Sequence, residues 1–132
     1  MCPVLLVCHL AEAATPGLAD RAERAAALLS AQPGCRWVEV GRAVDDPAAW
    51  VLLARFDSVP AYRRALGPFD VREHVVPLLS LTGQGDGPGE RPATFETLLE
   101  AVDGEVRRHR SDRAPGGPPE RPGGSGDPRA PR

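Results

Sequence analysis

Short apolar runs separated by turn residues fill the first part of the chain and predict alternating strands and helices. Residues 4–10 form an apolar run too short for a helix, which is typical of a strand buried on both faces. Thr15 and Pro16 predict a helix start, because threonine caps helices and proline fits their first position. Apolar residues then recur at helical spacing, and Asp20 and Arg24 form an i,i+4 pair on the predicted solvent side.

Two strands and a second helix are predicted next. Residues 35–44 alternate in polarity and predict a strand, and the Asp-Asp-Pro sequence at residues 45–47 predicts a turn. Residues 50–56 are largely apolar on both faces, which predicts a central strand. An Asp-Ser pair then predicts the cap of a helix over residues 59–66.

The order strand, helix, strand, strand, helix gives the first five elements of a ferredoxin-like βαββαβ unit. This unit is an α+β fold with an antiparallel sheet, and its sixth element is a strand. Residues 69–82 predict an irregular helix, because Pro77 would kink it. Residues 82–92 predict a glycine-rich loop whose spacing does not fit a nucleotide-binding loop. In residues 93–102 the apolar positions have helical spacing, which conflicts with the strand that the fold requires.

The composition changes at Gly104. Residues 104–132 are mostly Pro, Gly and Arg with almost nothing to bury, which predicts a disordered tail after a domain at residues 1–103. Arginines outnumber acidic residues in this tail, but no aromatic residue is interleaved with them. A solubilising extension is therefore favoured over contact with nucleic acid.

The cysteine content and the N-terminal sequence indicate a cellular compartment. Cys2, Cys8 and Cys35 form no C-x-x-C pair, which argues for a reducing compartment and against a disulfide framework or a zinc site. The N-terminal apolar run lacks the basic start of a signal peptide and is interrupted by His9. No segment approaches the ~18 apolar residues that a membrane helix needs. We therefore expect a cytoplasmic protein without a membrane partner.

Four segments, taken in order, carry a family resemblance. They are the apolar VLLVCHL, the long segment QPGCRWVEVGRAVDDPAAWVLLARFDSVPAYRRAL, the histidine-containing VREHVVPLL and a late P-x-x-F-E stretch. Together they are similar to the antibiotic biosynthesis monooxygenase group of dimeric α/β-barrel proteins, over residues 4–99. In that group the P-x-x-F-E region is the fourth strand, so the resemblance makes residues 93–100 a strand, against their helical spacing.

The resemblance implies a homodimer in which two four-stranded sheets face each other, with a ligand pocket between sheet and helices in each protomer. Some members of the group oxidise polycyclic aromatic polyketide intermediates with O2 and without metal or flavin. Others degrade haem, and many have no known activity. We therefore expect a small aromatic substrate and no cofactor or metal.

Two candidate catalytic residues follow from this resemblance, and a third, Arg72, follows from its position two residues before His74. Tyr62 matches one of two aromatic residues that surround the substrate in the cofactor-free oxygenases. His74 matches a frequent histidine and could donate to a ligand carbonyl or stabilise an enolate. Arg72 could hold a phenolate or a carboxylate. Structural explanations stay open for all three: a core position for Tyr62, and solvent-facing positions for His74 and Arg72.

Phe56, Trp37 and His9 are candidate substrate-binding residues. Phe56 stands where the group often has a tryptophan and lacks the indole N–H, and it could equally be a core aromatic. Trp37 could lie over the pocket or pack in the dimer interface, where tryptophan is enriched. His9 lies in an apolar strand, which predicts partial burial and a hydrogen-bond partner, in the pocket or across the sheet.

Three functions are consistent with the sequence. The first is a cofactor-independent monooxygenase for a planar phenolic polycycle, in which the deprotonated substrate reduces O2 and His74 and Arg72 stabilise the anion. The second is a non-catalytic dimeric barrel that binds an aromatic intermediate or assists a polyketide pathway enzyme. Phe56 and the absence of asparagine favour it, because the oxygenase and haem-degrading branches place an asparagine in the pocket. The third is haem binding or degradation through His74 or His9.

Overall fold

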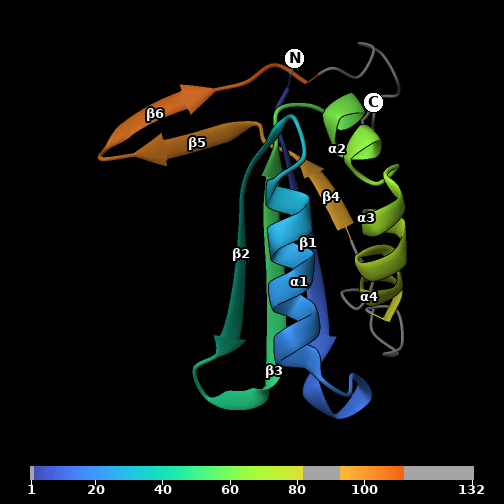
Figure 1. The fold of residues 1–132 in the computed structure, drawn as a ribbon. Helices are drawn as coiled ribbons and strands as arrows, with labels where there is room; N and C mark the ends of the chain where they lie inside the picture. Colours follow the sequence, from blue (N-terminus) through green and yellow to red (C-terminus); the bar gives the residue numbers. More distant parts are fainter. Residues whose placement is uncertain (1, 82–92, 112–132) are drawn as a thin grey trace, which may run out of the picture.

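The computed structural model of the chain describes residues 2–81 and 93–111, and its elements follow the predicted order (Figure 1). The strands and helices are β1 (Val4–Ala11), a short 3₁₀ turn η1 (Glu12–Ala14), α1 (Leu18–Ser30), β2 (Cys35–Ala43), β3 (Asp46–Phe56), α2 (Val59–Ala65), α3 (Phe69–His74), α4 (Val76–Ser80), β4 (Ala93–Glu96), β5 (Leu99–Val102) and β6 (Glu105–Arg108).

A four-stranded antiparallel sheet of order β2-β3-β1-β4 organises the fold. This order is that of the predicted ferredoxin-like βαββαβ unit, with β3 central as expected. Residues 93–96 form the fourth strand, pairing Phe95 with Leu5 of β1. The predicted continuation of this strand to Glu100 is wrong, because the chain leaves the sheet at Thr97, whose N–H donates to the carbonyl of Pro3 at 2.8 Å.

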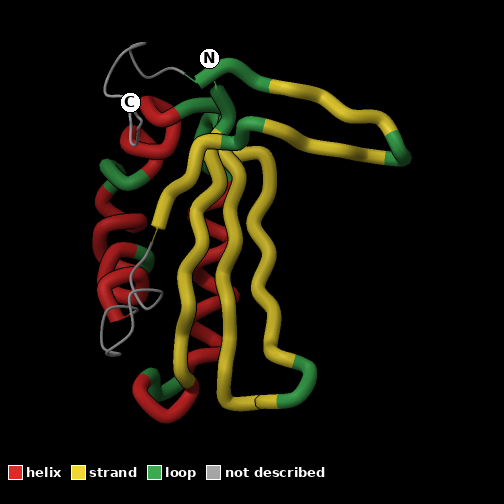
Figure 2. Tube along the Cα trace, turned by 180° about the vertical axis from the view of Figure 1, so that it is seen from behind, coloured by secondary structure: helices red, strands yellow, loops and turns green. Residues whose placement is uncertain are grey.

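The helices cover one face of the sheet and enclose the core (Figure 1). Alternate residues of each strand point toward them, so that Leu6 of β1 and Leu52 and Phe56 of β3 are fully buried. On the opposite face no described element lies over the strands (Figure 2). Leu5 and Leu53 on that face are only partly buried. Within a single protomer, the prediction that β1 is buried on both faces is therefore confirmed for one face only.

The two main helix starts differ from each other in their capping. Ser58 caps α2 as predicted, its Oγ accepting a hydrogen bond from the N–H of Ala61 at 3.2 Å. The predicted cap of α1 by Thr15 is wrong: the helix begins after Gly17, which adopts a φ of 69° and gives no side-chain cap. Thr15 is instead buried, and its Oγ1 has no hydrogen-bond partner among the described residues.

The segment predicted as an irregular helix is two short helices, α3 and α4, which break at Val75. Pro77 lies in the first turn of α4, where its missing N–H costs no helical hydrogen bond. Segment 82–92, predicted as a glycine-rich loop, lies outside the described residues. None of the described helices is long and apolar enough to span a membrane.

A β-hairpin formed by β5 and β6 extends away from the body, beyond the end of the sheet near the N-terminus (Figure 1). Residues 105–108, which the composition assigns to the tail, form strand β6, and Asp103 and Gly104 form the turn between the two strands. Residues 112–132, the rest of the predicted tail, lie outside the described residues. At the hairpin base Glu100 accepts one hydrogen bond from Arg55 of β3 and pairs with His109.

Candidate functional site

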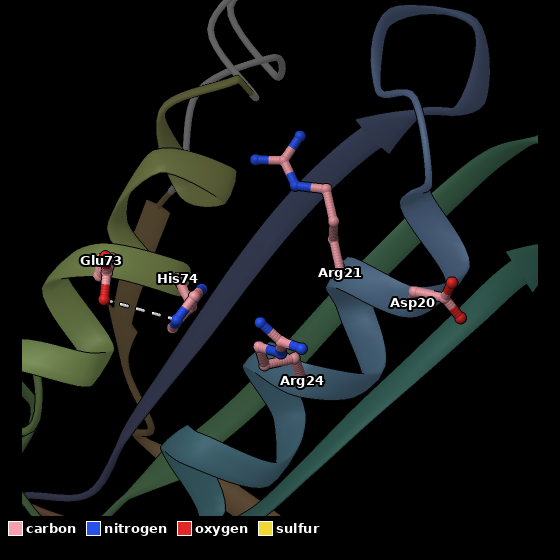
Figure 3. Close-up of a pocket in the computed structure, with 5 residues that line it drawn as sticks. All are labelled: Asp20, Arg21, Arg24, Glu73 and His74. Atoms are coloured by element: carbon pink, nitrogen blue, oxygen red, sulfur yellow. Dashed lines mark ion pairs between the residues drawn. The ribbon is translucent and has the colours of Figure 1, made fainter.

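A pocket of about 240 Å³ lies between α1 and α3 and brings His74 together with charged residues of α1 (Figure 3). Its lining residues are Asp20, Arg21, Arg24, Glu73 and His74. The two helices pack against each other through apolar residues of the core, which fixes the separation of the two charged walls.

Arg21 and Arg24 form the α1 wall of the pocket. They lie one turn apart on α1, with Arg21 beside the buried Ala22 and Ala25 and Arg24 further toward solvent, and both line the pocket (Figure 3). Arg21 is half-buried and Arg24 is exposed. The carboxylate of Asp20 points away from both guanidinium groups in Figure 3, and the predicted Asp20–Arg24 ion pair does not form.

His74 forms the opposite wall as the last residue of α3. Its side chain is 35% exposed, and its Nε2 lies 3.6 Å from Oε1 of the neighbouring Glu73. Arg72 belongs to the same helix but is exposed and does not line this pocket. The pocket therefore brings one imidazole and two guanidinium groups together with the carboxylates of Asp20 and Glu73. The imidazole can transfer a proton, and the guanidinium groups can donate hydrogen bonds to an oxyanion.

Phe56 and Tyr62 form an aromatic pair at a different place in the fold. Their ring centroids lie 5.4 Å apart with an interplanar angle of 65°, an edge-to-face contact. Phe56 is fully buried, whereas Tyr62 is partly exposed and lines a second pocket of about 250 Å³. That pocket is also lined by Val4, Val59, Arg63, Thr94 and Glu96, so Tyr62 and His74 line different pockets.

The other two candidate binding residues lie on the open face of the sheet, opposite the helices. Trp37 pairs with Arg55 and is 36% exposed, and His9 pairs with Val51. The predicted partial burial of His9 is wrong: its side chain is exposed, because it falls on the alternate positions of β1 that face away from the core. Of the six candidates, Phe56 and Tyr62 are in ring contact with each other.

A comparison with known protein families identifies the family of this chain. The model of the family described as antibiotic biosynthesis monooxygenase matches residues 9–74, half of the sequence. The chain belongs to the antibiotic biosynthesis monooxygenase family. Among curated proteins, none matches the chain.

Several solved structures share the fold of this chain. Rv0793 from Mycobacterium tuberculosis is 19% identical, with a TM-score of 0.60 over 76% of this chain and 99% of that chain. A single-site mutant of SnoaB, a cofactor-independent oxygenase from Streptomyces nogalater, is 18% identical, with a TM-score of 0.54 over 88% of this chain and 99% of that chain. At these identities the likeness establishes the fold.

The sequence does not predict Arg21 and Arg24 as residues of the pocket between α1 and α3. The i,i+4 spacing predicts a solvent-side pair of Arg24 with Asp20. The helix pattern distinguishes the two arginines, because Arg21 lies beside the apolar stripe of α1 whereas Arg24 and Asp20 lie on its solvent side. What the sequence lacks is the information that α3 packs beside this flank.

Cys35, at the start of β2, carries a partly buried thiol and does not line this pocket. Burial raises the pKa of the Cys35 thiol, with a smaller opposing effect from a hydrogen bond to the carbonyl of Trp37, so this thiol is less acidic than a free cysteine. Within residues 2–81 and 93–111, no group of three or more His, Cys, Asp and Glu side chains is arranged to hold a metal ion.

Proposed function

We propose that this member of the antibiotic biosynthesis monooxygenase family is a cofactor-independent monooxygenase that oxidises a polycyclic aromatic, polyketide-type intermediate with O2. For an anthrone-type substrate, the reacting methylene carbon loses two hydrogens and gains one oxygen atom, and the second oxygen atom leaves as water. The substrate supplies the electrons: once deprotonated to its enolate, it can pass one electron to O2. The protein then has to favour the anion and hold it in place.

The observation that carries this proposal is the position of His74 in a pocket with Arg21 and Arg24. An imidazole can accept the proton that the substrate loses when the enolate forms. Two neighbouring guanidinium groups stabilise the negative charge that results. We assign proton transfer to His74, and keep Arg72, which is exposed on the same helix, as a residue that attracts the anion.

Tyr62 has a second role in this proposal. It extends the aromatic surface of Phe56 from the core to a surface pocket, where the edge of a planar ring can pack against it. Its hydroxyl makes no hydrogen bond with another described residue, so it is available to a ligand. Phe56 is fully buried, so its ring cannot contact a substrate. Its role in this proposal is to position the ring of Tyr62 through their edge-to-face contact.

The apolar side chains on the open face of the sheet support the proposal that the protein is a homodimer. Its partly or fully exposed apolar side chains include Leu5, Val7, Trp37, Val51, Leu53 and Phe95. Antiparallel sheets with one solvated face normally present polar residues there, and a contiguous apolar face of this kind marks an interaction site. We assign this face to a second copy of the chain, as the family resemblance implies, with Trp37 in the interface and His9 nearby.

One observation favours the alternative of a non-catalytic barrel that binds an aromatic intermediate. Phe56 is fully buried, and its ring lacks the N–H donor that a tryptophan would provide at this position. The chain also contains no asparagine whose amide could donate a hydrogen bond in the pocket. A binding protein needs only an apolar surface and an anion site, both of which the described residues supply.

The variants His74→Ala and Tyr62→Phe distinguish the two functions. An oxygenase loses turnover in both variants while its affinity for the substrate changes little. A binding protein shows no turnover above the uncatalysed reaction, and the variants change affinity only. Val76→Ala is the matched control, because Val76 lies two residues from His74 and is 38% exposed. Equal turnover in wild type and His74→Ala would remove His74 from the proposed mechanism.

A further inference from the structure

The hairpin formed by β5 and β6 stands clear of the other described elements beyond its base. The two strands make a sheet of their own, which extends past the end of the main sheet (Figures 1 and 2). An isolated two-stranded hairpin is marginally stable at best in water, and a third strand or a packed surface is needed to stabilise it. The outer part of this hairpin therefore needs a packing surface that the described residues of one protomer do not supply.

The two faces of the hairpin differ in polarity. Strand pairing places Ala101 opposite Val106 and Leu99 opposite Arg108, all on one face. The residues of the other face are Glu100, Val102, Glu105 and Arg107. Leu99, Ala101 and Val106, called here the apolar hairpin face, are all exposed, and the two larger side chains, those of Leu99 and Val106, are each more than half exposed. An apolar face of this kind marks a contact with another surface.

Glu100 orients the hairpin relative to the main sheet. Its carboxylate accepts a hydrogen bond from Arg55 at 3.3 Å and lies 2.8 Å from Nε2 of His109. Arg55 lies on the open face of the sheet, where it pairs with Trp37 of β2, and its side chain is only 14% exposed. Because Glu100 turns toward its own sheet, the apolar hairpin face on the other side of β5 turns away from its own protomer.

The hairpin begins where the open face of the sheet ends. Leu5, Arg55 and Trp37 form the last row of that face, and Glu100 and His109 contact this row through Arg55. A second copy of the chain that covers the open face therefore also reaches the base of the hairpin. In a two-fold dimer each copy gives one hairpin and receives the other, so both apolar hairpin faces leave water together.

We propose that the hairpin of β5 and β6 is an arm that docks on a second copy of the chain through Leu99, Ala101 and Val106. The contacts of Glu100 with Arg55 and His109 hold the arm in the orientation that this docking needs. The inference rests on the homodimer of the proposed function, but it does not depend on the oxygenase activity.

Amide hydrogen exchange of the full chain across a dilution series tests the inference without any substitution. We expect the protection of β5 and β6 to fall as the dimer dissociates, which light scattering follows in parallel, while the central strands β1 and β3 stay protected. The variant Leu53→Glu supplies the monomer if dilution does not. A hairpin that exchanges equally fast in dimer and monomer would overturn the inference and leave the dimer of the open face in place. A wild-type chain that is monomeric at every concentration would overturn both.

Val106 and Val102 provide a matched pair of variants, because they lie on opposite faces next to the same turn and are similarly exposed. Val106→Lys should raise the dissociation constant of the dimer at least about tenfold, because it places a charge in the docked face. Val102→Lys should stay within about twofold of wild type. An unchanged dissociation constant in Val106→Lys, or an equal loss in both variants, contradicts docking through this face. The wild-type exchange measurement decides the question if Val106→Lys disrupts the hairpin itself.

Discussion

The carboxylate of Glu100 lies 2.8 Å from Nε2 of His109, across the base of the hairpin formed by β5 and β6. This hydrogen bond, with a smaller contribution from the charge of Arg55, holds the pKa of Glu100 below its ordinary value of 4.5. A carboxyl group whose pKa is lowered by folding stabilises the folded form above its unfolded pKa, and this stabilisation is lost as the pH falls through the folded value. We therefore expect the hairpin to loosen below about pH 4.5.

The variant Glu100→Gln should loosen the hairpin at neutral pH as well, because the amide cannot form the same charge-assisted contacts with Arg55 and His109. Amide hydrogen exchange in β5 and β6 measures this, with faster exchange expected in the variant. Glu105→Gln, at the exposed start of β6, is the control and should leave exchange unchanged. Identical protection in wild type and Glu100→Gln would contradict the assigned role of Glu100.

Variants of Phe56 and Tyr62 distinguish a structural role from a chemical role in the aromatic pair. Phe56→Ala should lower the free energy of unfolding by about 3–5 kcal/mol, because it removes a fully buried ring that also contacts Tyr62. Tyr62→Phe should change it by less than about 0.5 kcal/mol, because the ring contact is retained and the hydroxyl has no described partner. Denaturant unfolding measures both, and a large loss in Tyr62→Phe would show that its effect on turnover is structural.

The open face of the sheet predicts how the dimer can be dissociated. Leu53→Glu places a charge at the centre of the apolar face, where burial against a partner would leave it unpaired. Light scattering should report a dimer for wild type and a monomer for this variant. Val44→Glu, in the exposed turn between β2 and β3, should stay dimeric. A wild-type monomer at micromolar concentration would contradict the assigned interface.

Much of the fold could be predicted from local patterns. The apolar run of β1, the alternation of β2 and the Ser58 cap each depend on residues close together in sequence, and each is confirmed. Residues 93–96 needed the family resemblance, because their strand is stabilised by pairing with β1 rather than by their own spacing. The sequence does not predict the hairpin, because Gly104 and the arginines after it have the composition of a disordered tail. Glu100 and His109 stabilise the hairpin through a contact that composition does not reveal.

The arrangement of the candidate site depends on contacts that the sequence does not show. The family resemblance predicts both His74 and Tyr62 as site residues, and in the structure they line different pockets. Strand alternation could have placed His9 and Trp37 on the face opposite the helices, since both occupy positions out of phase with the buried residues. Arg21 required knowledge of which helix packs beside α1, a long-range contact that one sequence does not contain.

Oxygen uptake by the purified full chain, freed of metal and flavin and supplied with an anthrone, tests the central claim most directly. The control is the autoxidation of the anthrone under the same conditions. The account predicts uptake well above this control, one O2 consumed per anthrone converted to anthraquinone, and loss of the excess in His74→Ala and Tyr62→Phe. Uptake equal to autoxidation, with the anthrone bound tightly by the protein, would contradict the oxygenase and favour the binding protein.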